Sequence, residues 1–260
     1  MKGRDLLLVS CILFFLIAFF LGFFLVRFDN SLRMVATSNA FVLAIGIPSF
    51  LGAVRWLGRR RGLLLLATMG LLTLAIEGLA IVTGFPYGAF SYSLNLGPRL
   101  FDLVPFIVPF TYLPLLLGAV TIAWRRAGDS LPIRILVSAL LLLLIDLVLD
   151  PALVHAGMWT YSQPGAYFGV PLSNFIGWIF TGALYSALVH GISTFGGRSP
   201  ALPPVLMAAS LLLDLSLWTG YLLREMLLVP AVLGLVLAAG TVYLLFTGNE
   251  ERPRGGSPSG

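Results

Sequence analysis

Apolar runs of about 20 residues recur along almost the whole chain, separated only by short polar breaks. Because the hydrocarbon core of a bilayer is about 30 Å thick, a run of this length is what a membrane-spanning helix requires. Charged residues make up only 10% of the chain and the mean hydropathy is +0.98, whereas a typical soluble domain carries about 25% charged residues. The sequence therefore predicts an all-α, polytopic integral membrane helical bundle.

We expect about eight transmembrane helices, which leave no room for a soluble domain. The expected spans are residues 6–26, 34–56, 63–84, 103–124, 131–150, 173–195, 203–223 and 227–247. They make residues 1–247 a single transmembrane helical domain. The first span is too long for an ordinary signal peptide, so we expect an uncleaved helix. Residues 248–260 are rich in Gly, Ser and Pro and are expected to form a disordered cytoplasmic tail.

The positions of Lys and Arg predict the orientation of the bundle. With eight spans, twelve of the 16 basic residues fall on the side of the two termini and four on the other side. Both termini are therefore expected to face the cytoplasm, in a multi-pass protein of the cell membrane. A basic face beside anionic lipid accounts for most of the net charge of +5 without a nucleic-acid partner.

Two stretches 69 residues apart carry the same pattern. Glu77 precedes the sequence GAFSYS (88–93) by eleven residues, and Asp146 precedes GMWTYS (157–162) by the same number. A charged side chain inside a spanning helix costs about 2.5 to 3.5 kcal/mol on insertion scales, so it is by default a candidate functional group. We interpret the stretches as a tandem two-helix repeat, helices 3–4 and 5–6, with a site between the copies. The alternative is a coincidence of aromatic loops after two helices.

The repeated acids are expected in the outer half of the bundle. Helices three and five both run outward, which places Glu77 and Asp146 within about two turns of their outer ends. Asp150 follows Asp146 by four residues and shares its helix face. Because Pro151 disfavours helical geometry at the preceding residue, we expect the fifth helix to end at Asp150. Glu77, Asp146 and Asp150 are the candidate catalytic residues.

A carboxyl cluster in this setting suits proton chemistry. Removal from water and repulsion by a second carboxylate both favour the neutral acid, so one member is expected to stay protonated near pH 7. A protonated carboxyl group beside a carboxylate that binds water can add a proton and then water to an unactivated alkene. Aromatic faces can stabilise the carbocation between the two steps. The alternative for each acid is a hydrogen-bonded contact between helices.

Two long connections, about residues 85–102 and 151–172, are expected on the outer side, and loops of this length are more often functional than ordinary connections. Their aromatic residues also fit an interfacial belt, because Trp and Tyr gather at the depth of lipid headgroups. That alternative does not explain the matched spacing. The candidate substrate-binding residues are Tyr87, Phe90, Tyr92, Asp102, His155, Trp159, Tyr161 and Asn174.

Some of these residues have equally simple structural explanations. Asp102 is expected at the start of the fourth helix, where a negative charge is favourable. His155 fits a loop hydrogen bond as well as a proton relay, and Asn174 fits a helix start. Asp214 lies in the seventh span, where we expect a hydrogen bond between helices. Arg99 is the nearest candidate for a basic partner of the acids.

The chain offers no recognisable cofactor or metal motif. It contains no GxGxxG or Walker sequence and no cluster of Cys and His residues, and the expected topology separates His155 from His190. The chemistry is therefore expected to need neither a cofactor nor a metal.

Several motifs together resemble one known family. They are Glu77-Gly78, GFPYG (84–88) with Phe90 and Tyr92, Asp146 with Asp150-Pro151, GMWTY (157–161) and GVPLSNF (169–175). The combination is similar to the carotenoid biosynthesis protein family of bacteria and archaea, which includes bisanhydrobacterioruberin hydratases and carotenoid 1,2-hydratases of the same type. The resemblance covers about residues 60–195. It implies hydration of the terminal isopropylidene double bond of a linear or half-cyclised carotenoid, which leaves a tertiary alcohol.

This resemblance implies a carotenoid substrate that enters laterally from membrane lipid, and it allows association with other membrane enzymes of the pathway. One alternative is a cofactor-free carotenoid cyclase or isomerase that uses the same protonation step. The small membrane lycopene cyclases share the acid-plus-aromatic arrangement, but their Pro-Glu-Glu signature is missing here. The other alternative is a proton-coupled transporter, which should show polar residues along a path to both faces. Residues 63–66 of the third span and 140–144 of the fifth span are instead entirely leucine.

Overall fold

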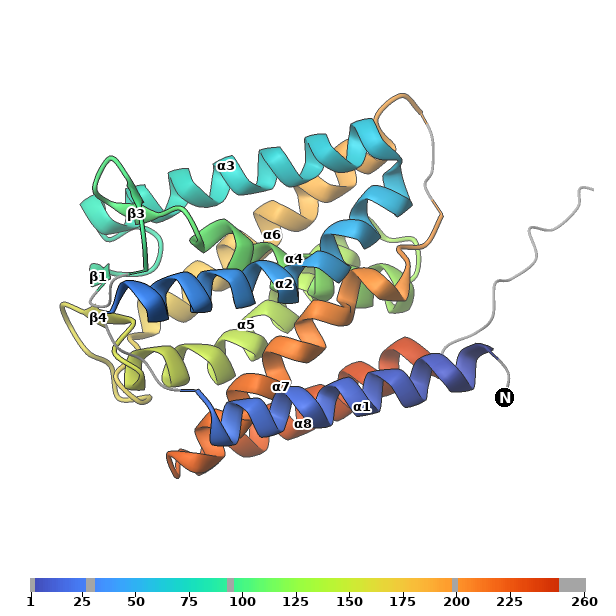
Figure 1. The fold of residues 1–260 in the computed structure, drawn as a ribbon. Helices are drawn as coiled ribbons and strands as arrows, with labels where there is room; N and C mark the ends of the chain where they lie inside the picture. Colours follow the sequence, from blue (N-terminus) through green and yellow to red (C-terminus); the bar gives the residue numbers. More distant parts are fainter. Residues whose placement is uncertain (1–2, 27–30, 93–95, 198–200, 248–260) are drawn as a thin grey trace, which may run out of the picture.

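The computed structural model describes residues 3–26, 31–92, 96–197 and 201–247, and the expected tail, 248–260, lies outside them. The described residues form eight α-helices in one bundle (Figure 1). The helices are α1 (Gly3–Phe24), α2 (Leu32–Leu57), α3 (Arg59–Thr83), α4 (Val108–Arg126), α5 (Leu131–His155), α6 (Leu172–Thr194), α7 (Ala209–Arg224) and α8 (Leu228–Phe246). The connections between the helices contain four short strands: β1 (Phe90–Tyr92), β2 (Arg99–Leu100), β3 (Val104–Pro105) and β4 (Trp159–Tyr161).

Most of these helices can cross a membrane. In the described part of the chain, seven stretches are long and apolar enough: α2 to α6, α8, and α7 with the 3-10 turn Val205–Ala208 before it. The first helix contains a shorter apolar stretch, Ile12–Phe24. This result confirms the predicted all-α, multi-pass membrane bundle.

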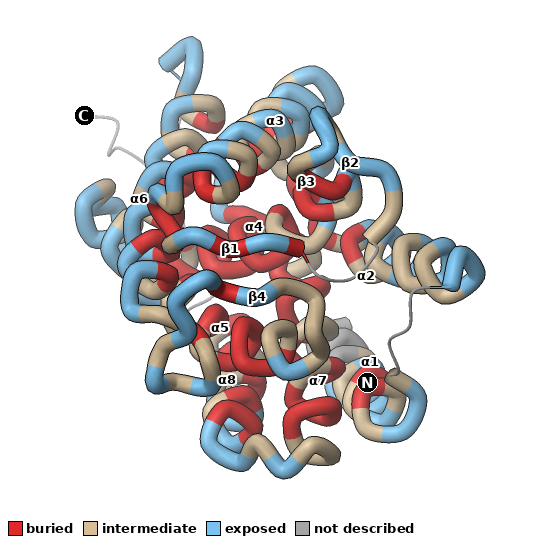
Figure 2. Tube along the Cα trace, turned by 90° about the vertical axis from the view of Figure 1, so that its left-hand side faces the viewer, coloured by how far each residue is buried: buried red, intermediate tan, exposed pale blue. Residues whose placement is uncertain are grey.

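Helix α4 forms the centre of the bundle. It packs against α2, α3, α5, α6, α7 and α8, and its residues from Leu113 to Trp124 are all buried. Figure 2 shows α4 surrounded by the other helices. The remaining helices turn apolar side chains such as Leu71 and Val82 outward, as a membrane-embedded surface requires.

Helix α1 lies at the periphery and packs mainly on α7. A Cβ atom added to Gly22 of α1 would collide with the carbonyl of Leu217, and one added to Gly220 of α7 would collide with the carbonyl of Phe19. Small residues at such positions let two membrane helices approach closely. Helix α2 packs instead against α3, α4 and α7.

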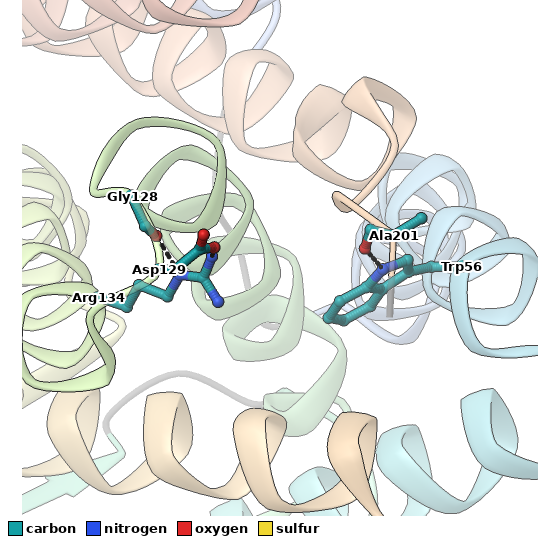
Figure 3. Close-up of polar contacts among 5 residues, drawn as sticks. All are labelled: Trp56, Gly128, Asp129, Arg134 and Ala201. Atoms are coloured by element: carbon teal, nitrogen blue, oxygen red, sulfur yellow. Dashed lines mark hydrogen bonds and ion pairs between the residues drawn. The ribbon is translucent and has the colours of Figure 1, made fainter. Parts of the chain in front are cut away.

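The two ends of the bundle differ in construction. At the end that carries the arginine-rich connections, single hydrogen bonds fasten the short loops (Figure 3). The indole N–H of Trp56 donates to the carbonyl of Ala201 at 2.6 Å. Arg134 donates to the carbonyl of Gly128 at 2.7 Å and to the carboxylate of Asp129 at 2.8 Å. These contacts join loops to helix ends.

At the opposite end, β1 and β4 pair with each other across the bundle. The pairing is antiparallel, with Phe90 opposite Tyr161 and Tyr92 opposite Trp159. Figure 2 shows the two strands side by side over the ends of the helices. Since β1 and β4 occupy equivalent positions in the predicted repeat, the ladder relates the two copies by a local two-fold arrangement.

The fourth helix begins later than predicted. The sequence favoured a span from residue 103, but α4 starts at Val108, and Pro109 occupies its first turn, where a missing N–H is tolerated. The preceding residues form a β2–β3 hairpin. Asp102 lies in its turn with a left-handed backbone (φ 58°), a conformation that hairpin turns use. The expectation that Asp102 starts a helix was wrong.

The fifth helix continues past its predicted end at Asp150. Pro151 lies inside α5, which reaches His155. A proline in a helix leaves the carbonyl four residues earlier without its N–H donor. That carbonyl belongs to Leu147, and it accepts a hydrogen bond from the hydroxyl of Tyr167 at 2.9 Å. The long loop after α5 thus replaces the missing backbone donor.

Candidate active site

The predicted acids lie directly beneath the β1–β4 ladder. Glu77 comes from α3, and Asp146 and Asp150 come from α5. All three side chains are buried, with at most 2% of their surface exposed. Buried carboxyl groups need hydrogen-bond partners, and the ladder and α6 supply them.

Each strand of the ladder ends in a tyrosine, and this tyrosine bonds an acid of the helix that precedes the strand in the sequence. The hydroxyl of Tyr92 donates to Oε2 of Glu77 at 2.6 Å, and the hydroxyl of Tyr161 donates to Oδ2 of Asp150 at 2.7 Å. Burial, followed by the charge of the neighbouring carboxylates, raises the pKa of both tyrosines well above the usual range. Both hydroxyls therefore remain protonated donors at neutral pH.

Asn174 joins the two aspartates. It lies in the first turn of α6 and is buried. Its Nδ2 atom donates to Oδ2 of Asp146 at 2.8 Å and to Oδ2 of Asp150 at 2.6 Å. Since an amide nitrogen carries two hydrogens, one side chain serves both carboxyl groups. The contact holds Asp146 and Asp150 beside each other.

The acids have no basic partner in the described part of the chain. Its ion pairs are Arg134–Asp129 and Arg224–Glu225, both distant in sequence from the ladder. Arg99, the predicted candidate, donates instead to the backbone carbonyl of Tyr92 at 3.3 Å. The donors that face the three acids are therefore neutral tyrosine and amide groups.

A cavity of about 460 Å³ opens beside the two aspartates. It lies between α1 and α2 on one side and α4, α5 and α7 on the other, and apolar side chains form most of its wall. Its volume is within the range of about 300 to 1,000 Å³ typical of ligand pockets. Residues of its wall that matter here are Tyr92, Tyr112, Asp146, Asp150, Trp159, Trp178 and Asp214.

A second, much smaller cavity adjoins the first. Its wall is formed by Tyr87, Phe90, Tyr92, Tyr112, Asp150, Trp159, Tyr161 and Asn174. The two cavities together collect most of the predicted substrate-binding residues. Glu77 lines neither of them, but it bonds Tyr92, which lines both.

Two predicted site residues lie elsewhere. Asp102 is exposed on the hairpin turn and lines neither cavity. His155 is the last residue of α5, and its Nδ1 atom lies 3.0 Å from the hydroxyl of Tyr221 on α7. The structure does not bring either side chain to the acids.

Three residues of the large cavity did not follow from sequence reasoning. Asp214 was expected to make a hydrogen bond between helices, but it faces the cavity, and no hydrogen bond joins it to another described residue. Tyr112 and Trp178 stack at 5.0 Å between ring centroids and form part of the wall. For Tyr112, the sequence gives one indication of a functional position, which is a hydroxyl-bearing side chain within an apolar span. Nothing in the sequence pairs it with Trp178.

Beside the β1–β4 ladder, Oε1 of Glu77 and Nε1 of Trp159 are buried and have no hydrogen-bond partner among the described residues. Most buried polar groups in proteins are paired, so such atoms point to a functional position or to a bound molecule. Within the described residues, no group of three or more His, Cys, Asp or Glu side chains is placed to hold a metal ion.

Fold and site define a multi-pass helical membrane protein whose buried carboxyl groups open into an apolar cavity. The family model described as "Carotenoid biosynthesis protein" matches residues 33–241, which include α2 to α7, most of α8 and every acid of the site. The chain belongs to this family.

A curated relative is the bisanhydrobacterioruberin hydratase of Haloarcula japonica. It is 34% identical over 201 residues, which cover 76% of this chain and 68% of the relative. No solved structure matches the chain. The family and this relative support a carotenoid-modifying membrane enzyme.

Proposed function

We propose that the protein is a carotenoid hydratase, which adds water to the terminal isopropylidene double bond of a linear or monocyclic carotenoid. The observation that carries the proposal is the pair Asp146 and Asp150, held by one amide and opening into a mostly apolar cavity. An alkene end fits such a wall, and the carboxyl groups beside it can donate and accept the protons that hydration requires. The name of the relative points to the same reaction class.

The reaction begins with transfer of a carboxyl proton to the CH carbon of the double bond. The π electrons form the new C–H bond, and the adjacent carbon becomes a tertiary cation. A lone pair of water then forms the C–O bond, and the released proton goes to a carboxylate. The net change is the addition of one water molecule, with the acid regenerated.

The wall of the cavity suits the charged intermediate. Tyr92, Trp159 and Trp178 present aromatic rings to the same space as the acids. A cation near an aromatic face is stabilised by about 0.5 to 2 kcal/mol, more where water is excluded. The aromatic rings therefore favour formation of the cation in the first step, and they also shape the pocket.

The substrate would enter from the lipid. The large cavity extends between α1 and α2. These two helices pack mainly against other helices of the bundle and not against each other. We propose that the reacting end lies beside Asp146 while the rest of the polyene extends between α1 and α2 into the bilayer. A proton-coupled transporter is less suitable, because residues 63–66 of α3 and 140–144 of α5 are entirely leucine.

The test is direct. The protein is expressed in bacteria that accumulate different acyclic carotenoids, and the pigments are analysed by mass. Hydration adds the mass of one water per reacted end. An unchanged mass with altered absorption would identify a cyclase or isomerase instead, and no change with any acyclic carotenoid would contradict an enzyme of this class.

We further propose that both termini face the cytoplasm of the cell membrane. Reporter fusions should then place the connections at residues 57–59 and 126–131 in the cytoplasm and the β1 and β4 loops outside. If Tyr92 and Arg60 report the same side, the proposed orientation and the span count are wrong.

A further inference from the structure

The two adjoining cavities differ in size and chemistry. The large one has a volume of about 460 Å³ and a mostly apolar wall. The small one has a volume of about 10 Å³, close to the minimum of about 10 to 15 Å³ that one water molecule needs. One cavity therefore fits a hydrocarbon chain, and the other fits a single small polar molecule.

We propose that the small cavity binds the water molecule that is added to the substrate, with Asp146 as the acid that protonates the alkene and Asp150 as the base that accepts the proton of the water. This inference rests on the proposed hydratase function and divides its two steps between two carboxyl groups.

The wall of the small cavity has the polar groups that a bound water requires. A buried water usually makes about three hydrogen bonds. Four tyrosines, Asp150 and Asn174 line the cavity, and their side chains carry hydroxyl, carboxyl and amide groups. In addition, the buried Nε1 atom of Trp159 has no partner among the described residues and can donate to a water.

The positions of the aspartates relative to the cavities assign their roles. Asp150 lines both cavities, whereas Asp146 lines only the large one. Asp146 therefore reaches the alkene but not the water. Asp150 is the carboxyl group placed to take a proton from a water that attacks a cation in the large cavity.

Glu77 has a different role in this arrangement. It touches neither cavity, but its Oε2 atom holds the hydroxyl of Tyr92, and Tyr92 belongs to the wall between the two cavities. Glu77 is thus a positioning residue for that wall.

The proton balance closes within the site. Asp146 loses a proton to the alkene carbon, and Asp150 gains one from the water after the C–O bond forms. Both carboxyl groups lie within 2.8 Å of the same nitrogen of Asn174. Return of the proton from Asp150 to Asp146 restores the starting state, and no further reactant is consumed.

The two steps can be measured separately in heavy water. Protonation and its reversal introduce deuterium into recovered substrate, while capture of the cation by water gives the tertiary alcohol. Membranes that contain the full-length protein are incubated with an acyclic carotenoid that the wild-type protein hydrates. Deuterium in the recovered carotenoid and the yield of alcohol are then determined by mass spectrometry.

We expect Asp146→Asn to lose both deuterium exchange and hydration. Asp150→Asn should lose hydration by about 10²-fold or more, the usual contribution of a general base, while deuterium exchange into the substrate persists. Tyr87 lines the small cavity but not the large one, so Tyr87→Phe should lower hydration about threefold to tenfold with exchange unchanged. Tyr185→Phe is the matched control, because Tyr185 is equally buried and bonds Thr73 outside both cavities.

The proposal is overturned if Asp150→Asn loses exchange together with hydration, or if it hydrates normally. It is also overturned if Tyr87→Phe, measured per molecule in the membrane, behaves like Tyr185→Phe. If Asp150→Asn fails to accumulate in the membrane, the comparison of Tyr87→Phe with Tyr185→Phe decides the question. A wild-type protein that shows neither exchange nor hydration would overturn the hydratase function itself, and the water site with it.

Discussion

The two copies of the repeat share a plan but differ in what they present to the cavity. In the first copy, Glu77 bonds Tyr92 and lies behind the cavity wall. In the second copy, Asp146 and Asp150 open into the cavity, and Tyr161 bonds Asp150 rather than the acid that corresponds to Glu77. The duplicated element is therefore the tyrosine–acid contact. The chemistry is concentrated in the second copy.

The sequence explains how this asymmetry arose. Position 81 of the first copy, which corresponds to Asp150, is Ile81. Asn174 is the third residue of α6, and the third residue of α4, the equivalent helix of the first copy, is Phe110. The first copy thus lacks both the second acid and the amide that joins the pair. It retains the contact between Tyr92 and Glu77, which supports the β1–β4 ladder.

The strongest test of this difference is removal of an acid from the second copy. Asp146→Asn should lower turnover by about 10² to 10⁴, the range typical of general acid–base groups, with the protein still present in the membrane. The measurement is alcohol formed per molecule of protein. Asp129→Asn is the control, since Asp129 is exposed and pairs with Arg134 at the other end of the bundle. Near-normal turnover in Asp146→Asn would reject acid chemistry at this site.

Removal of the acid from the first copy should have a smaller effect. Glu77→Gln weakens one hydrogen bond to a charged group, which corresponds to about tenfold to a hundredfold in rate. Tyr92→Phe removes the same contact from the other side. Because both residues act through one contact, the double variant should be little worse than either single one. The first copy would have a direct chemical role if the losses in turnover of the two single variants multiply in the double variant. The same conclusion would follow if Glu77→Gln lost as much turnover as Asp146→Asn.

The aromatic wall should contribute less again. Trp159→Leu keeps an apolar side chain but removes a ring that faces the cavity, so we expect a loss of about threefold to thirtyfold in turnover. Trp56→Leu is the control, because Trp56 is also partly buried but bonds Ala201 at the opposite end (Figure 3). Trp56→Leu should change the stability of the protein but not its turnover. If both variants have equal turnover, the outer tryptophan is an anchor at the membrane surface.

The smallest effect is expected for Asp102→Asn. Asp102 is exposed on the β2–β3 turn and lines neither cavity, and surface substitutions of this kind change stability by about 0.5 kcal/mol or less. Turnover should stay within about twofold of the wild-type value. A loss above tenfold would mean that the hairpin folds over the cavity when substrate binds.

Hydropathy and repeat spacing predict the bundle and a site between the two copies of the repeat, near one end of the helices. These features depend on local sequence, since a spanning helix needs only length and apolar composition. The start of α4 was not predicted, because an apolar run interrupted by prolines reads like a helix until the hairpin is known. The cavity position of Asp214 was not predicted either. The rotation of α7 depends on its contacts with α1, and those contacts depend on backbone approach at Gly220.

The division of roles among the acids also lies beyond sequence reasoning. Glu77 and Asp146 occupy equivalent positions, and pattern alone treats them alike. Only the structure separates them: Glu77 bonds Tyr92 and lines neither cavity, whereas Asp146 lines the large one.

The most direct test of the central claim traces the oxygen of the product. Membranes with the wild-type protein are incubated with an acyclic carotenoid in oxygen-18 water, and the alcohol is analysed by mass spectrometry. The account predicts one labelled oxygen at each reacted end, a loss of the labelled product in Asp146→Asn and its retention in Asp102→Asn. An unlabelled product, or labelled product in Asp146→Asn at the wild-type rate, would contradict hydration by the buried aspartates.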